Sequence, residues 1–180
     1  MDDLIRIYGS GLDDDYCEHL IDKFEKNSEK HEKIGGHRRS FTQLHMFTND
    51  LWQEEVNKIL AIFVNCLNLY VNDCKIAKIQ WPDDYKWEGF RMKRYLPDDQ
   101  DEFYNHVDVQ NYELANRFLT FFMYLNNNEG GQTDFPMLEK HADCKQGDIL
   151  LFPPMWPWVH RGKKPIDKPK YIVQSYFHYV

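Results

Sequence analysis

The sequence predicts an α+β fold that is mainly β, with two helices preceding a small barrel or jelly roll of short strands. The first observation is that the N-terminal part contains two amphipathic stretches with helical spacing. The second is that the remainder alternates β-branched and aromatic residues in short segments, separated by polar, Pro and Gly residues. The third is that 180 residues, 42% of them hydrophobic, suit one domain with a sizeable core and are too few for two. We therefore expect one domain over residues 1–180, with helical support over about 1–75 and a β core over about 76–180.

The first helix is expected soon after a short N-terminal strand. Residues 4–8 alternate weakly and precede Gly9-Ser10-Gly11, which predicts a turn. Asp13 or Asp14 can then cap a helix, and the acidic first turn suits the helix dipole. One face of this helix should be buried, because Tyr16, Leu20 and Phe24 recur at helical spacing.

The second helix is expected after an exposed loop and a strand. Residues 35–40 contain two glycines and three basic residues, and we favour a solvated connector here over a role in substrate contact. Residues 41–47 predict a strand, after which Thr48 or Asn49 can cap a long helix. Its apolar stripe indicates packing rather than a cofactor site. The stripe consists of Leu51, Trp52, Val56, Ile59, Leu60, Phe63 and Leu67.

The rest of the chain is expected to form strands. The run Asn126–Gly131 predicts a hairpin turn, since Asn and Gly tolerate positive φ, and Gly147 predicts a turn into a buried strand. Strand ends are defined to within about two to four residues. The predicted strands are Ile76–Trp81, Glu88–Tyr95, Tyr104–Asp108, Arg117–Leu125, Gln132–Phe135, Asp148–Phe152 and Tyr171–Tyr179.

Charge, cysteine usage and hydropathy exclude several classes of protein. A net charge of −7 disfavours a nucleic-acid-binding surface and favours a basic peptide as partner. Four cysteines without a Cys-x-x-Cys pair indicate reduced thiols rather than a disulfide scaffold. The first residues do not resemble a signal peptide, and the most apolar run, Leu60–Val71, is shorter than the roughly 20 residues of a membrane span. We therefore expect a cytoplasmic protein.

Three residues have the pattern of an iron-binding site. His106 and Asp108 are two positions apart, so on a strand both side chains would point to one face. His160 lies far downstream in an apolar, aromatic-rich segment. Two histidines and one carboxylate are the ligands of a facial triad that holds non-haem Fe(II) with open positions. Taken singly, each residue would more often have a structural role, as we expect for most of the eight histidines.

Other residues near the triad in sequence could bind an anion. Lys170 follows His160 by ten positions and begins an alternating strand, while Thr120 and Tyr124 fall on one face of another strand. A buried cation with two hydroxyl donors provides what an anionic carboxylate requires.

The ordered combination of these residues resembles the prolyl 4-hydroxylase branch of the 2-oxoglutarate/Fe(II)-dependent dioxygenases, in a compact form similar to microbial or viral members. The resemblance covers residues 90–179. It rests on Arg94-Tyr95, His106-x-Asp108, Tyr124-Leu125-Asn126, Gly130-Gly131-x-Thr133-x-Phe135, Gly147-Asp148-x-Leu150-x-Phe152, His160-x-Gly162 and Lys170.

The resemblance implies a double-stranded β-helix, a kind of jelly roll, and specific roles for the site residues. His106, Asp108 and His160 would be the iron ligands. Lys170 would pair with the distal carboxylate of 2-oxoglutarate, which Tyr124, Thr120 and Tyr95 would also contact. The substrate pocket would include Tyr104, Trp158, Tyr176 and Arg94.

The activity implied is hydroxylation of a prolyl residue in a peptide or protein, with 2-oxoglutarate converted to succinate and CO2. O2 would be the second cosubstrate, and ascorbate would support turnover. Two segments depart from the family pattern, Leu96–Asp99 and Phe152–Trp156, and both would reshape the substrate groove. The alternatives are hydroxylation of another amino-acid side chain or a small molecule, nucleic-acid repair, which the charge disfavours, and a catalytically silent β-barrel binding module.

Overall fold

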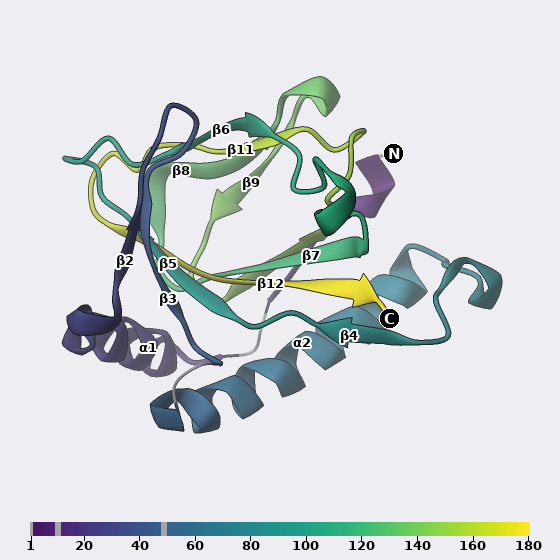
Figure 1. Ribbon diagram of the computed structural model, residues 1–180, viewed down its shortest axis with the longest axis horizontal. Helices are drawn as coiled ribbons and strands as arrows, with labels where there is room; N and C mark the ends of the chain where they lie inside the picture. The colour runs from purple at the N-terminus through teal and green to yellow at the C-terminus, as the bar shows by residue number, and fades with distance from the viewer. Residues whose placement is uncertain (1, 10–11, 48–49) are drawn as a thin grey trace.

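Two facing β-sheets form the body of the protein, and two helices cover the outer face of the larger sheet (Figure 1). The computed structural model describes residues 2–9, 12–47 and 50–180. The larger sheet has the order β1 (Arg6–Gly9), β10 (Asp148–Phe152), β7 (Arg117–Tyr124), β12 (Lys170–Tyr179), β5 (Arg91–Tyr95), β3 (Phe41–His45) and β2 (Glu32–Ile34), and β4 (Tyr85–Trp87) also pairs with β12. The smaller sheet has the order β6 (Phe103–His106), β11 (His160–Gly162), β8 (Asn128–Phe135) and β9 (Lys140–Cys144). The predicted mainly β jelly roll with N-terminal helices is confirmed.

The helices begin close to where the sequence predicts. Asp13 caps α1 (Asp14–Lys26), and its side chain accepts a hydrogen bond of 2.9 Å from the backbone N–H of Tyr16. A short 3₁₀ turn over Asp50–Trp52 precedes α2 (Gln53–Asp73). The predicted caps at positions 48 and 49, and two residues of the predicted turn at 9–11, lie outside the described residues. Within the described ranges, neither helix is long and apolar enough to cross a membrane.

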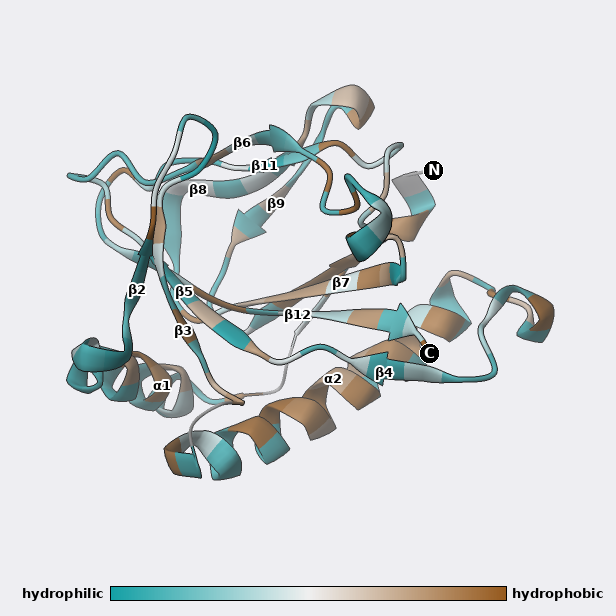
Figure 2. Ribbon diagram, in the orientation of Figure 1, coloured by the Kyte–Doolittle hydropathy of each residue, from teal (hydrophilic) through white to brown (hydrophobic). Residues whose placement is uncertain are grey.

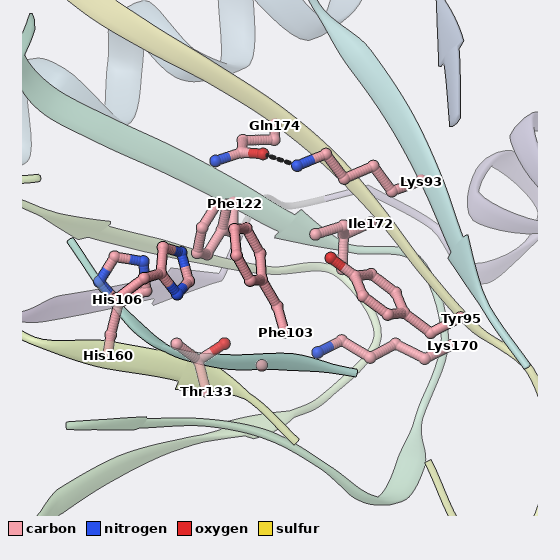
Figure 3. A pocket seen from close by; sticks show the side chains of 11 residues that line it. Lys93, Tyr95, Phe103, His106, Phe122, Thr133, His160, Lys170, Ile172 and Gln174 are labelled. Carbon is pink, nitrogen blue, oxygen red and sulfur yellow. Dashed lines mark hydrogen bonds between the residues drawn. The ribbon is translucent and has the colours of Figure 1, made fainter. Parts of the chain in front are cut away.

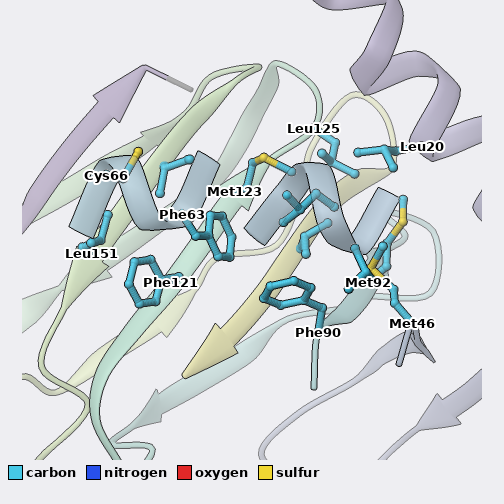
Figure 4. Close-up of a cluster of buried hydrophobic side chains, with 14 of the residues drawn as sticks. Leu20, Met46, Phe63, Cys66, Phe90, Met92, Phe121, Met123, Leu125 and Leu151 are labelled. Carbon is cyan, nitrogen blue, oxygen red and sulfur yellow. The ribbon is translucent and has the colours of Figure 1, made fainter. Parts of the chain in front are cut away.

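Alternation along the central strands separates two hydrophobic cores. On β7, Phe121 and Met123 face the helices, whereas Phe122 and Tyr124 face the smaller sheet. The core under the helices includes Phe63 and Cys66 of α2 (Figure 4), and hydrophobic residues are concentrated in α2 and the strands that it covers (Figure 2). The space between the two sheets is therefore the second core, and the polar side chains that enter it are candidates for function.

Two predictions of local structure are wrong. Residues 76–81 contain a 3₁₀ turn, Lys78–Gln80, instead of a strand. Asn126–Gly131 does not close a hairpin, because β7 and β8 belong to different sheets and this segment carries the chain from one to the other. The side chain of Asn126 anchors it by donating to the Pro169 carbonyl (2.8 Å) and accepting from the Tyr171 N–H (3.0 Å).

Candidate metal centre and cosubstrate pocket

The smaller sheet brings the three predicted metal ligands together. His106 ends β6 and His160 begins β11, and the two residues are directly opposite each other in the antiparallel pairing of these strands. Asp108 lies two residues beyond the end of β6. The Nε2 atom of His106 is 3.5 Å from Asp108 Oδ1, and that of His160 is 3.6 Å from Asp108 Oδ2. Ligand atoms of all three residues lie within 4.8 Å of one another, which suits a shared metal ion.

Hydrogen bonds leave the correct atoms free for a metal. The Nδ1 atom of His106 donates to the Tyr104 carbonyl at 2.7 Å, and that of His160 donates to the Trp158 carbonyl at 3.0 Å. A carbonyl only accepts, so each Nδ1 carries the proton and each Nε2 presents a lone pair. His160 Nε2 and Asp108 Oδ2 are buried without a hydrogen-bond partner among the described residues. Buried polar atoms without partners are unfavourable, and a metal cation would satisfy both.

The charge states of the site also suit a cation. Burial lowers the pKa of His160 to about 4, although Asp108 opposes this effect. Burial alone would raise the pKa of Asp108, but attraction to His160 and His106 outweighs it and lowers this pKa to about 2. Near neutral pH, His160 is therefore uncharged and Asp108 is ionised, the forms in which both can ligate a metal.

A cavity next to the histidines contains the predicted anion-binding lysine. Figure 3 shows the two histidines at one end, Lys170 and Tyr95 at the other, and Phe103 and Phe122 between them. Lys170 is 1% exposed, and burial lowers its pKa. Its Nζ lies 5.2 Å from the centre of the Tyr95 ring, but it has no hydrogen bond or ion pair with any residue that the structure describes. A buried ammonium without a counterion is costly, and a bound carboxylate would remove that cost.

Tyr124 and two glycines complete the wall around Lys170. The Tyr124 hydroxyl donates to Thr133 Oγ1 at 2.8 Å, and Thr133 lines the cavity. At Gly131, an added Cβ would lie only 3.0 Å from Lys170 Cδ, and at Gly162 it would lie 3.9 Å from Lys170 Nζ. Glycine at position 131, in the motif Gly130-Gly131-x-Thr133 on β8, therefore leaves room for the Lys170 side chain.

The other predicted cosubstrate and pocket residues have varied positions. Tyr95 lines the cavity. Thr120 lies on the same face of β7 as Tyr124, but beyond Phe122, where its hydroxyl donates to the Ser175 carbonyl at 3.4 Å. Tyr176 lines the groove that opens beside Asp108.

Three predicted pocket residues do not line the cavity or this groove. Arg94 lies on the opposite face of β5, where it pairs with Glu25 of α1 at 2.6 Å. The Tyr104 side chain is 50% exposed, and that of Trp158 is buried in the core between the sheets. Tyr104 and Trp158 instead contribute the backbone carbonyls that orient the two histidines.

Sequence reasoning missed two polar residues of the cavity, Lys93 and Gln174. Lys93 donates a hydrogen bond to Gln174 Oε1 across β5 and β12. The signal was present in the alternation, because Lys93 lies two positions before Tyr95 and Gln174 four positions after Lys170. Neither residue belongs to the motif that carries the family resemblance.

Comparisons with known proteins agree with this geometry. Residues 90–178 match the model of the 2OG-Fe(II) oxygenase superfamily. The viral collagen prolyl hydroxylase of Paramecium Bursaria Chlorella virus-1, solved with 2OG, superposes with a TM-score of 0.76 at 22% identity, over 98% of this chain and 97% of that one. A Pseudomonas putida prolyl-4-hydroxylase gives a TM-score of 0.71 at 17% identity, over 98% and 93% of the two chains. No curated protein matches significantly.

A third structure extends the likeness to animals. A Trichoplax adhaerens prolyl hydroxylase, in complex with a peptide fragment of the hypoxia inducible factor oxygen degradation domain, gives a TM-score of 0.74 at 15% identity, over 98% of this chain and 84% of that one. At these identities the likeness defines the fold, a jelly-roll oxygenase fold.

Fold, motif and metal-competent cluster define a non-haem iron oxygenase. The chain belongs to the 2-oxoglutarate/Fe(II)-dependent dioxygenase superfamily, as a compact member that resembles the prolyl 4-hydroxylases, and its cofactors are Fe(II) and 2-oxoglutarate.

Proposed function

We propose that this dioxygenase hydroxylates a prolyl residue of a peptide or protein. The observation that carries the proposal is one cavity with a cluster of metal-competent atoms at one end and, at the other, a buried lysine that no described residue pairs with. Three structural neighbours are prolyl hydroxylases, and one of them was solved with a peptide. A 2-oxoglutarate molecule has the carboxylate that Lys170 requires.

In this proposal His106, Asp108 and His160 hold Fe(II) on one face, and Lys170 binds the distal carboxylate of 2-oxoglutarate. Bound iron would supply the redox chemistry, in which one oxygen atom of O2 enters succinate, released with CO2, and the other enters the substrate as a hydroxyl group. The chain itself orients both imidazoles through backbone carbonyls and keeps their Nε2 atoms unprotonated. Tyr124 and Thr133 position the lysine end of the cavity.

Aromatic residues pack against both histidines of the site. Phe103 stacks on His106 with ring centres 3.5 Å apart, and Phe152 packs edge-on against His160 at 4.7 Å. These rings fix the imidazole planes and lower the local polarity, which strengthens the attraction between Lys170 and a carboxylate.

Turnover tests the proposal directly. The purified protein is incubated with Fe(II), ascorbate, O2 and 2-oxoglutarate, with and without Pro-containing peptides, and succinate and a one-oxygen mass gain are measured. We expect succinate formation to be coupled to a mass gain located on a prolyl residue by fragmentation. A mass gain on another side chain would refute prolyl specificity and retain the oxygenase. Exposed His141, replaced by Ala, is the matched control for His160→Ala, which should form no succinate.

A further inference from the structure

A second buried lysine faces the same cavity as Lys170. Lys93 is 6% exposed and lines both the cavity and the groove beside Asp108. Its ammonium donates to the neutral Gln174 Oε1 and lies 4.6 Å from the centre of the Phe41 ring. No carboxylate pairs with it in the described part of the chain. A methionine at this buried position would cost less free energy than a lysine, so the presence of a lysine requires an explanation.

The position of Lys93 is held by a short hydrogen-bonded chain. Gln174 accepts from Lys93 and donates through Nε2 to the Tyr176 hydroxyl at 2.5 Å. All three side chains lie on the faces of β5 and β12 that also carry Tyr95 and Lys170. The ammonium is therefore fixed before any ligand arrives, and a partner would bind without ordering it.

The groove outside Lys93 is basic, in contrast to the acidic chain as a whole. Its lining includes Arg39, Arg91 and Arg117, and these arginines add to burial, the main cause, in lowering the pKa of Lys93. Arg91 and Arg117 share Glu88, a residue that does not line the groove, whereas Arg39 is exposed and has no carboxylate partner among the described residues. Among the described residues, two carboxylates line this groove, Asp108 and Glu32, and Asp108 is a metal ligand in the proposed function.

The second anion does not reach Lys93. Glu32 accepts from Gln43 at 2.7 Å and lies 3.8 Å from His45. Asp108 is the carboxylate that attracts Lys93, and a metal cation would offset this attraction. With the metal bound, the described residues therefore leave the cavity with a fixed, buried lysine amine, a basic rim and no free anion, and an entering carboxylate would favour the protonated form of Lys93.

We propose that Lys93 binds a carboxylate of the substrate, so that the preferred substrate has an acidic group next to the residue that is hydroxylated. The inference rests on the proposed function. The carboxylate could belong to an Asp or Glu side chain beside the target, or to the chain terminus of a peptide that ends in the target residue. The proposed substrate is therefore acidic near the target residue, whereas the net charge of the chain favours a basic peptide. The local charge at the groove determines which substrate enters it.

Peptide binding tests this inference without requiring turnover. Fluorescein-labelled peptides that contain one proline flanked by Asp or Glu are compared with matched Asn or Gln peptides, by anisotropy on anaerobic protein with Fe(II) and 2-oxoglutarate. A second pair ends in proline as the free acid or the amide. We expect at least one acidic peptide to bind at least about tenfold more tightly than the matched peptide in which Asn, Gln or a terminal amide replaces the carboxylate. Lys93→Met should remove this difference, Lys93→Glu should reverse it toward Lys-containing peptides, and Lys86→Met, at an exposed position, should retain it.

Several results would overturn the inference. These are equal binding of acidic and amide peptides, no peptide binding at all, a preference that persists in Lys93→Met, or a Lys93→Met effect confined to the requirement for 2-oxoglutarate. Turnover of the same peptides separates the two proposals. Prolyl hydroxylation without acidic preference would retain the function and refute the role of Lys93. Acidic preference without any prolyl mass gain would retain the role of Lys93 and refute prolyl hydroxylation.

Discussion

Replacement of Lys93 by methionine is expected to stabilise the metal-free protein at pH 6 and to lose this effect by pH 10. Burial lowers the pKa of Lys93 from 10.5 to about 7, which at 1.36 kcal/mol per pKa unit corresponds to about 5 kcal/mol of unfavourable charge burial. Loss of the hydrogen bond to Gln174 costs about 1.5–3 kcal/mol, and loss of the contact with Phe41 costs about 1 kcal/mol. The net gain at pH 6 is then about 1–2 kcal/mol.

The pH dependence identifies the origin of this gain. The folded pKa is depressed, so the unfolded chain binds more protons between pH 7 and 10.5, and wild-type stability rises with pH in that window. Urea unfolding of wild type, Lys93→Met and the control Lys86→Met at pH 6 and pH 10 measures both effects. A gain that is independent of pH, or a loss of stability at pH 6, would refute the argument that Lys93 is a buried ammonium without a counterion.

Three further predictions concern the metal, the cosubstrate and the backbone. His160→Ala should weaken Fe(II) binding at least about 100-fold by anaerobic titration calorimetry, because one of three ligands is lost, whereas unchanged affinity would exclude His160 as a ligand. Lys170→Ala should raise the KM for 2-oxoglutarate about tenfold or more at unchanged Fe(II) affinity, while exposed Lys168→Ala should leave both constants unchanged. Gly130→Ala should reduce the free energy of unfolding, measured in urea, by about 1–3 kcal/mol. The reason is that φ is +79° at this position and the new Cβ would lie 2.5 Å from a side-chain carbon of Ile166. An unfolding free energy equal to that of wild type would contradict this.

The sequence was most informative where local patterns decide the structure. Asp13 caps its helix as predicted, and β10 has the predicted bounds, because caps and apolar runs depend on neighbouring residues. The strands β2, β9 and β11 were missed, since each is short and polar and is defined by its pairing partner rather than by its own alternation. The hairpin prediction for residues 126–131 was wrong because Asn and Gly indicate a change of chain direction but do not specify which strands the segment connects.

The candidate site was likewise predictable from the sequence only in part. His106, Asp108, His160 and Lys170 were identified from an ordered motif, and the structure brings all four to one cavity region. Lys93 was not identified, because alternation places it on the same strand face as Tyr95 but does not show that a lysine at this position is buried. Its role follows from pairing with a strand about 80 residues later, a long-range contact that no local pattern contains.

Strand β12 has a consequence for the dynamics of the pocket. It pairs with β7, β5 and β4, and its alternate residues belong either to the cavity, as with Ile172, or to the core beneath the helices, as with Val173 and Phe177. The strand cannot detach to open the cavity without also exposing the helix-covered core. Amide hydrogen exchange along β12 should therefore proceed only through global unfolding, and a ligand bound at Lys170 should slow exchange across the whole larger sheet.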